Sequence, residues 1–224
     1  MNIRRPLVIA AGLLLSGHPA VAQDMSRYRS YVLESSVASV VVASGARAAD
    51  TKTLHQRPAT IQQLEWRAPY VDYRNPLPDP VREISFTFYN DALYQVIVSY
   101  DRTRTEGLTD HDFVESLSTV YGATTTTTRT SPPPEGFPDS TVLARWESAD
   151  SSLTLTRGGY PPEVQLILVS KPLSARARIA VREAIKLDAI EAPRREALER
   201  EKEAGDALAA REKARSANKA AFRP

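Results

Sequence analysis

Few residues in this chain have the types and spacing that catalysis or metal binding requires. The sequence has no cysteine, which excludes thiol catalysis and cysteine-ligated zinc, and it has three histidines. His55 and His111 lie in different segments, and neither belongs to a zinc-binding pattern such as His-Glu-x-x-His. No nucleophile elbow, phosphate-binding glycine loop or calcium loop occurs either. We therefore predict no catalytic residue, no metal site and no cofactor.

Two short polar segments could do chemistry, but each also has a structural interpretation. The segment Asp110–Asp112, which includes a histidine, could supply oxygen and nitrogen ligands to a metal. The same residues follow Thr109 at an expected helix start, where acidic side chains complement the positive helix N-terminus. Asn90 and Asp91 separate two alternating apolar segments, as turn residues do. We favour the structural interpretation of both segments.

Carboxylates near strand ends leave a hydrolase as an alternative. Glu83, Asp101 and Glu106 lie near such ends and could serve an enzyme that cleaves an envelope polymer. The chain has 27 acidic residues, so pairs of this kind arise without selection for catalysis. A second alternative, a small-ligand carrier, would require an enclosed apolar cavity between the helices and the sheet.

Exposed aromatic and apolar side chains favour binding over catalysis. Three tyrosines lie in proline-bearing loops, where aromatic residues either anchor a protein interface or cover the core as lids. The charged C-terminal part adds a few large apolar residues. The candidate binding residues are Tyr70, Tyr73, Tyr160, Leu198, Leu208 and Phe222. We expect a non-catalytic protein–protein interaction or structural protein.

The N-terminus indicates where the protein acts. Residues 1–22 combine two arginines, an apolar stretch and Ala20-Val21-Ala22, which is typical of a secretory signal peptide. No later segment reaches the roughly 20 apolar residues of a membrane-spanning helix. The formal net charge of +2 gives no support for nucleic-acid binding. We expect a periplasmic or secreted protein whose partner is an unidentified envelope protein; the oligomeric state stays open.

Apolar periodicity predicts an α+β fold. Residues 31–45 begin as a short strand and continue as a helix that ends at Gly45, although a buried strand was an alternative for the valine-rich part. A strand at 59–66 and a proline-rich loop precede a hairpin at 84–100. A three-residue turn over 90–92 would place Phe88 opposite Tyr94 and keep the large apolar residues on one face. A second helix is expected from Thr109 to Gly122.

Three further strands follow, and each has an apolar face. The residues expected to share a face are Val142, Ala144 and Trp146; Leu153 and Leu155; and Val164, Leu166 and Leu168. Both halves of the chain therefore consist of a helix followed by a three-stranded antiparallel meander. The possible repeat units are 31–101 and 109–170, which would share one core within an α+β domain of residues 23–173.

This arrangement of short strand, glycine-terminated helix and meander resembles the small outer-membrane assembly lipoproteins and the tandem-repeat β-lactamase inhibitor proteins. In those families the sheet face binds another protein. The segment FYNDALYQVIVSYDRTRTEGLTDHD also resembles a segment of uncharacterised exported bacterial proteins. The first group carries a lipid-bearing cysteine that this chain lacks.

Residues 174–224 form a charged, alanine-rich tail. Ala177, Ala180, Ala184 and Leu187 recur at helical spacing, which predicts a helix that docks on the domain until Pro193 ends or kinks it. Beyond that proline we expect an exposed helix stabilised by charge pairs. Such a helix is either an extension without a partner or an arm that orders on a partner or an anionic envelope surface. From Arg194 onward nine basic and six acidic residues give a surplus of three, which is weak for an electrostatic anchor.

Overall fold

The computed structural model describes residues 24–69, 79–126, 132–134, 136–159, 162–221 and 223. The expected signal peptide lies outside these residues. The elements are β1 (Arg27–Tyr28), β2 (Tyr31–Val32), α1 (Val37–Ser44), the short 3-10 helix η1 (Ala48–Asp50), β3 (Lys52–His55), β4 (Ile61–Arg67), β5 (Val81–Tyr89), β6 (Ala92–Tyr100), α2 (Asp110–Tyr121), β7 (Ser140–Glu147), β8 (Ser151–Gly158), β9 (Glu163–Ser170) and α3 (Lys171–Ala221). No helix in the described ranges is both long and apolar enough to cross a membrane.

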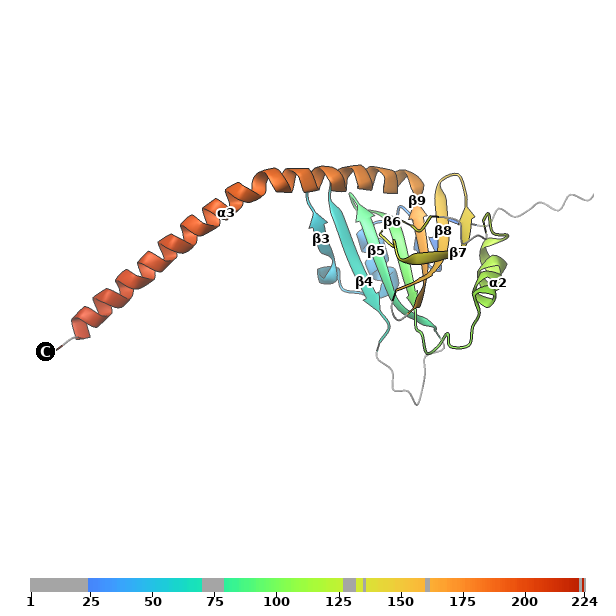
Figure 1. The fold of residues 1–224 in the computed structure, drawn as a ribbon, viewed down its shortest axis with the longest axis horizontal. Coiled ribbons are helices and arrows are strands. Elements are labelled where there is room, and N and C mark those ends of the chain that lie inside the picture. Colours follow the sequence, from blue (N-terminus) through green and yellow to red (C-terminus); the bar gives the residue numbers. More distant parts are fainter. Residues whose placement is uncertain are drawn as a thin grey trace, which may run out of the picture.

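Seven antiparallel strands form one sheet in the order β3-β4-β5-β6-β9-β8-β7 (Figure 1). The last strands of the two meanders, β6 and β9, pair at the centre. The meanders β4-β5-β6 and β7-β8-β9 thus extend outward from that pair, and a helix precedes each of them. This confirms the predicted α+β fold of two helix-plus-meander units with a shared core, to which β3 adds an edge strand. Common ancestry of the two units stays a prediction.

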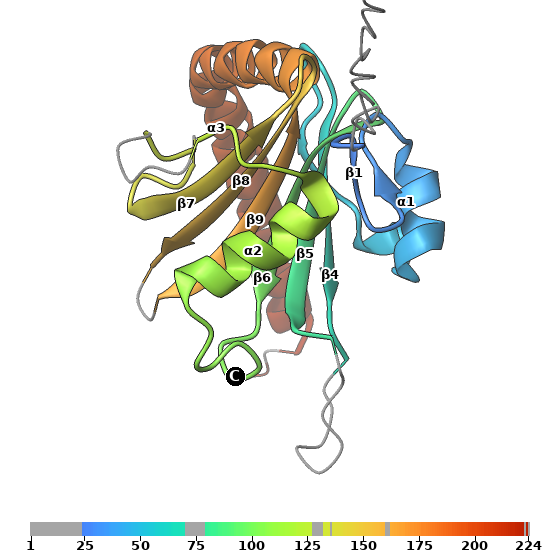
Figure 2. The same cartoon turned by 90° about the vertical axis from the view of Figure 1, so that its right-hand side faces the viewer.

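One face of the sheet packs against α1, α2 and the β1–β2 hairpin. Figure 2 shows α2 lying across this face. Apolar side chains alternate along the strands, so Leu64, Phe86, Val96 and Leu166 all point into the same core as Phe113 of α2. Burial of this apolar surface provides the main driving force for the fold.

Capping residues set the limits of α1 and α2 as the sequence predicts. The Ser36 hydroxyl accepts a hydrogen bond from the Ser39 amide, and Gly45 ends α1 with a φ of 68°. At α2 the Thr109 hydroxyl accepts from the Asp112 amide, while the Asp112 carboxylate accepts from the Thr109 amide. This reciprocal capping box satisfies amide groups that have no partner within the helix.

The hairpin between β5 and β6 differs from the prediction at its turn. Asn90 and Asp91 both have positive φ, 46° and 68°, which is the geometry of a tight two-residue turn. Phe88 therefore pairs with Leu93 and not with Tyr94. A β-bulge after the turn supplies the extra residue, so the predicted pairs Phe86–Val96 and Ile84–Val98 form.

A second bulge corrects the predicted face of β7. Val142 pairs with Thr156, whereas Ala144 pairs with Leu155, so one residue between them is inserted. Adjacent residues Leu155 and Thr156 point to opposite faces, and Val142 therefore lies on the face opposite to Ala144 and Trp146.

The third helix has a docked part and an exposed part. Figure 1 shows α3 running along the ends of the strands from β9 to β3 and then bending away from the domain. Ala177, Ala180 and Ala184 are buried, as their spacing predicted. Pro193 lies within the helix and accounts for the bend. We call residues 193–221 the arm; all of them are exposed.

Candidate functional site

An apolar hollow lies between α2 and the segment that follows β6. It has a volume of about 460 Å³. Its walls are Pro80, Tyr100, Arg104, Thr105, Leu108, Phe113, Ser116 and Leu117. We call it the α2 hollow. It is open to solvent on one side, so it is not the enclosed cavity that a small-ligand carrier would require.

The segment 101–108 is folded by its own hydrogen bonds. The Asp101 carboxylate accepts from the Arg104 amide at 3.1 Å, and the Asp101 carbonyl accepts from the Thr105 amide at 3.1 Å. Gly107 has a φ of 83°, a conformation that favours glycine. This compact turn places Leu108 at the mouth of the hollow, immediately before the helix cap at Thr109.

Ring and charge contacts fix the back wall of the hollow. The rings of Tyr100 and Phe113 lie with centroids 6.1 Å apart, a usual distance for aromatic pairs. Burial raises the pKa of Tyr100, and the neighbouring Tyr28 raises it further. Arg157 lies over the Phe113 ring at 5.8 Å and binds the Asp110 carboxylate at 2.8 Å. These contacts hold the aromatic wall in place before any ligand arrives.

A network around Asp79 holds the opposite wall. Arg29 donates two hydrogen bonds to the Asp79 carboxylate, at 2.5 and 2.8 Å, and these bonds lower the pKa of that carboxyl. Arg104 donates to the Asp79 carbonyl at 2.9 Å. Pro80 follows directly in the chain, so its ring is fixed against the hollow.

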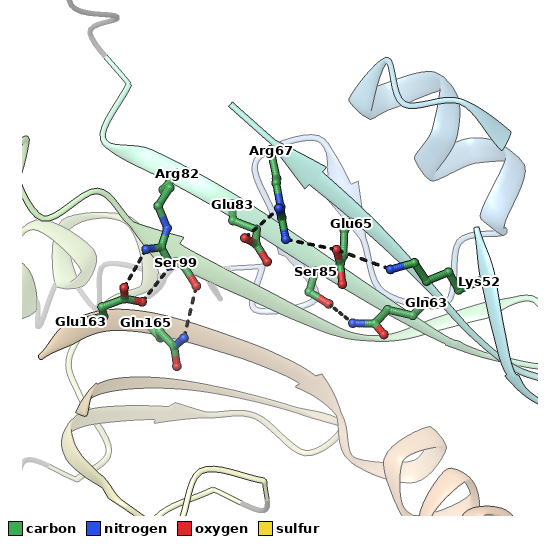
Figure 3. Close-up of polar contacts among 10 residues, drawn as sticks. All are labelled: Lys52, Gln63, Glu65, Arg67, Arg82, Glu83, Ser85, Ser99, Glu163 and Gln165. Carbon is green, nitrogen blue, oxygen red and sulfur yellow. Dashed lines mark hydrogen bonds and ion pairs between the residues drawn. The ribbon is translucent and has the colours of Figure 1, made fainter. Parts of the chain in front are cut away.

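The other face of the sheet carries a band of polar residues and paired charges. Figure 3 shows a row of polar contacts across it. Gln63 donates to Ser85 at 3.0 Å, and Gln165 donates to Ser99 at 3.2 Å. The ion pairs on this face are Lys52–Glu65, Arg67–Glu65, Arg67–Glu83 and Arg82–Glu163. Three basic residues thus balance three acidic ones, and the row is electrically neutral.

The three carboxylates considered for hydrolysis do not share one site. Two of them bind neighbouring groups, and the third lines a different hollow. Glu83 pairs with Arg67 at 3.3 Å, and Asp101 caps its own turn. Glu106 lines a smaller hollow of about 290 Å³ beside Arg102. Within the described ranges, no three His, Asp or Glu residues cluster closely enough to hold a metal ion.

The two polar segments considered for chemistry have structural contacts. Asp110 binds Arg157, and Asp112 closes the capping box of α2. The Asn90 side chain accepts a hydrogen bond from the amide that precedes β4, and the Asp91 side chain accepts one from the Val37 amide at the start of α1. Both interpretations that we favoured from the sequence thus match the observed contacts.

The predicted binding residues are divided between the arm and the undescribed segments. Tyr70, Tyr73, Tyr160 and Phe222 lie outside the described residues. Leu198 and Leu208 are 57% and 66% exposed on the arm. Neither Leu198 nor Leu208 therefore lines the α2 hollow.

The α2 hollow itself was missed in the sequence. One local signal could have revealed part of it, because Leu108 precedes the helix cap and Phe113 is the fourth helical residue. Apolar residues at these two positions form a hydrophobic staple, and both line the hollow. The remaining walls come from segments that only the fold brings together.

Comparison with known proteins gives no relative: no family model matches the chain, and neither the curated proteins nor the solved structures contain a match.

Proposed function

We propose that this chain is an exported, non-catalytic binding protein of the bacterial envelope that holds a protein partner at the α2 hollow. The observation that carries the proposal is the hollow itself, an apolar, preformed depression at the surface. Leu108 at its mouth is 47% exposed, and Val120, one turn beyond Ser116 on α2, is 60% exposed. Exposed apolar side chains around a preformed depression are typical of the centre of a protein interface.

An apolar side chain of the partner would insert between Leu108 and the Tyr100–Phe113 wall. The hollow is large enough for one aromatic or two aliphatic side chains, and its walls need not reorganise because ring contacts and the Asp79 network hold them. Such preorganisation lowers the entropy cost of binding. The polar band on the other sheet face would lie outside the contact, since its charges already pair with one another.

A charge at the mouth of the hollow tests this proposal. Leu108→Lys places an ammonium group where the partner's apolar side chain would enter, and its exposure keeps the effect on folding small. Val42→Lys is the matched control, because Val42 is 83% exposed on α1, away from the hollow. Crosslinking in intact cells followed by affinity purification should recover a defined partner with the wild type and the control, and at least tenfold less with Leu108→Lys.

Equal recovery with all three proteins would contradict a contact at the hollow. Loss with both variants would also contradict it, because charge anywhere on the surface would then have the same effect. Circular dichroism of the purified variants checks that the fold is intact.

The volume of the hollow, about 460 Å³, favours a second candidate function even though the hollow is open on one side. Pockets for small molecules usually measure about 300–1,000 Å³, so the second candidate is the binding of a small apolar ligand that stays partly exposed. Mass spectrometry of an organic extract of the purified protein would detect such a ligand. A stoichiometric compound that is lost in Leu108→Lys would favour the carrier over the protein-binding function.

A further inference from the structure

The charges of the arm are unevenly distributed along its length. Residues 194–206 carry four basic and five acidic residues, whereas residues 207–223 carry five basic residues and one acidic residue. The surplus of three found from Arg194 onward therefore hides a distal segment with a surplus of four. We call residues 207–223 the distal segment; it comprises the end of the arm and the two residues that follow the arm in the sequence.

The two parts of the arm act as separate charges. Their centres, near residues 200 and 215, lie about 22 Å apart along a helix that rises 1.5 Å per residue. Electrostatic interactions in water at physiological ionic strength are screened over about 8 Å. The acidic residues of the first part therefore do not cancel the field at the tip, and the folded domain lies farther away still (Figure 1).

Three of the five basic residues of the distal segment form a stripe. Arg211, Arg215 and Lys219 follow one another at intervals of four, so they lie on one side of the helix. Leu208 lies on the same side and is 66% exposed. Arg215 pairs with Glu212 at 3.3 Å, but both side chains are about 70% exposed, and such pairs contribute little. The stripe can thus face an external anionic surface over three helical turns.

We propose that the distal segment binds the anionic headgroups of an envelope membrane and so holds the domain at the membrane surface. An interface with a protein usually has an apolar core, whereas Leu208 is the large apolar side chain that the structure describes on this segment, and Phe222 is the one other large apolar residue in its sequence. A basic stripe with so few large apolar residues instead fits a flat, diffuse array of negative charge. The inference rests on the envelope location proposed above and not on the α2 hollow.

Vesicle binding of the mature full-length chain tests the proposal. Each basic residue near an anionic membrane contributes about fivefold in affinity. Wild type should sediment with vesicles that contain phosphatidylglycerol and phosphatidylcholine, and not with phosphatidylcholine alone. The variant Arg211→Gln/Arg215→Gln/Lys219→Gln should bind about 100-fold more weakly.

A matched control removes the same charge from the first part of the arm. Arg194→Gln/Arg200→Gln/Lys202→Gln lowers the net charge equally and should bind within about threefold of wild type. Circular dichroism of each variant checks that helicity is retained.

The proposal would be overturned if wild type did not bind the anionic vesicles, if it bound neutral vesicles equally well, or if the two triple variants lost binding to the same extent. An acidic protein as the true occupant would produce the first of these results. The assay contains no protein partner, so its failure leaves the Leu108 experiment unaffected, and the reverse also holds.

Discussion

Removing the C-terminal helix at two different points should separate its structural part from its exposed part. Of the residues that the structure describes, a chain that ends at Ala192 loses only exposed ones, so its free energy of unfolding should stay within about 0.5 kcal/mol of the full chain. A chain that ends at Leu173 also loses the burial of Ala177, Ala180 and Ala184. At about 0.8 kcal/mol per buried methyl group, this costs at least 2–3 kcal/mol, before the newly exposed sheet surface is counted.

Urea denaturation followed by tryptophan fluorescence provides the assay, since Trp146 is buried in the core. In thermal unfolding followed by the same fluorescence, the midpoint of the chain that ends at Leu173 should lie roughly 5–10 °C below that of the chain that ends at Ala192. Equal stability of the two truncated chains would refute the docking of α3. A loss in the Ala192 chain as large as that in the Leu173 chain would refute the exposure of the arm.

Two neighbouring substitutions test the same docking without truncation. Ala180 is 6% exposed and Ile179 is 62% exposed, although isoleucine is by far the more hydrophobic residue. Ala180→Lys should destabilise the full chain by about 2–3 kcal/mol, because the larger charged side chain cannot fit against the sheet. Ile179→Lys should cost less than about 0.5 kcal/mol. The opposite order would mean that the helix docks through another face.

Other predictions concern the domain alone. Thr109→Ala removes the hydroxyl half of the capping box with Asp112, so unfolding in urea should show a loss of about 1 kcal/mol, and Thr109→Ser should restore most of it. Trp146→Phe removes the hydrogen bond that the indole donates to the Gly122 carbonyl at 2.8 Å and should cost about 1–3 kcal/mol. Burial raises the pKa of Tyr121 to about 12, whereas an unfolded tyrosine ionises near pH 10. The contribution of the neutral Tyr121 to the free energy of unfolding is fully present below pH 10 and is lost as the pH rises toward 12. Tyr121→Phe should therefore make the fall in stability between pH 10 and pH 12 less steep.

The sequence predicts most of the elements because their signals are local. The cap at Thr109, the glycine after α1 and the alternation of apolar residues each involve neighbours in the chain. The two bulges could not be predicted in the same way. At the β5–β6 turn, a longer turn and a tight turn with a bulge give the same pairing of Phe86 with Val96. The alternation of apolar residues shows which residues share a face of the sheet, but it does not show where the extra residue of a bulge is inserted.

The candidate site was harder to predict, since its walls come from segments far apart in the chain. Pro80 and Phe113 are more than 30 residues apart, and no local pattern indicates that they line one hollow. The arm shows the converse problem: the uneven distribution of charge is present in the sequence, but a single net charge for the arm hides it. A net charge counted over all residues from Arg194 onward treats residues separated by several screening lengths as if they acted together. Charge should therefore be counted over segments no longer than the distance at which the charges still interact. Counted in that way, the sequence alone distinguishes a nearly neutral first part of the arm from a basic tip, and only the separation of that tip from the domain requires the structure.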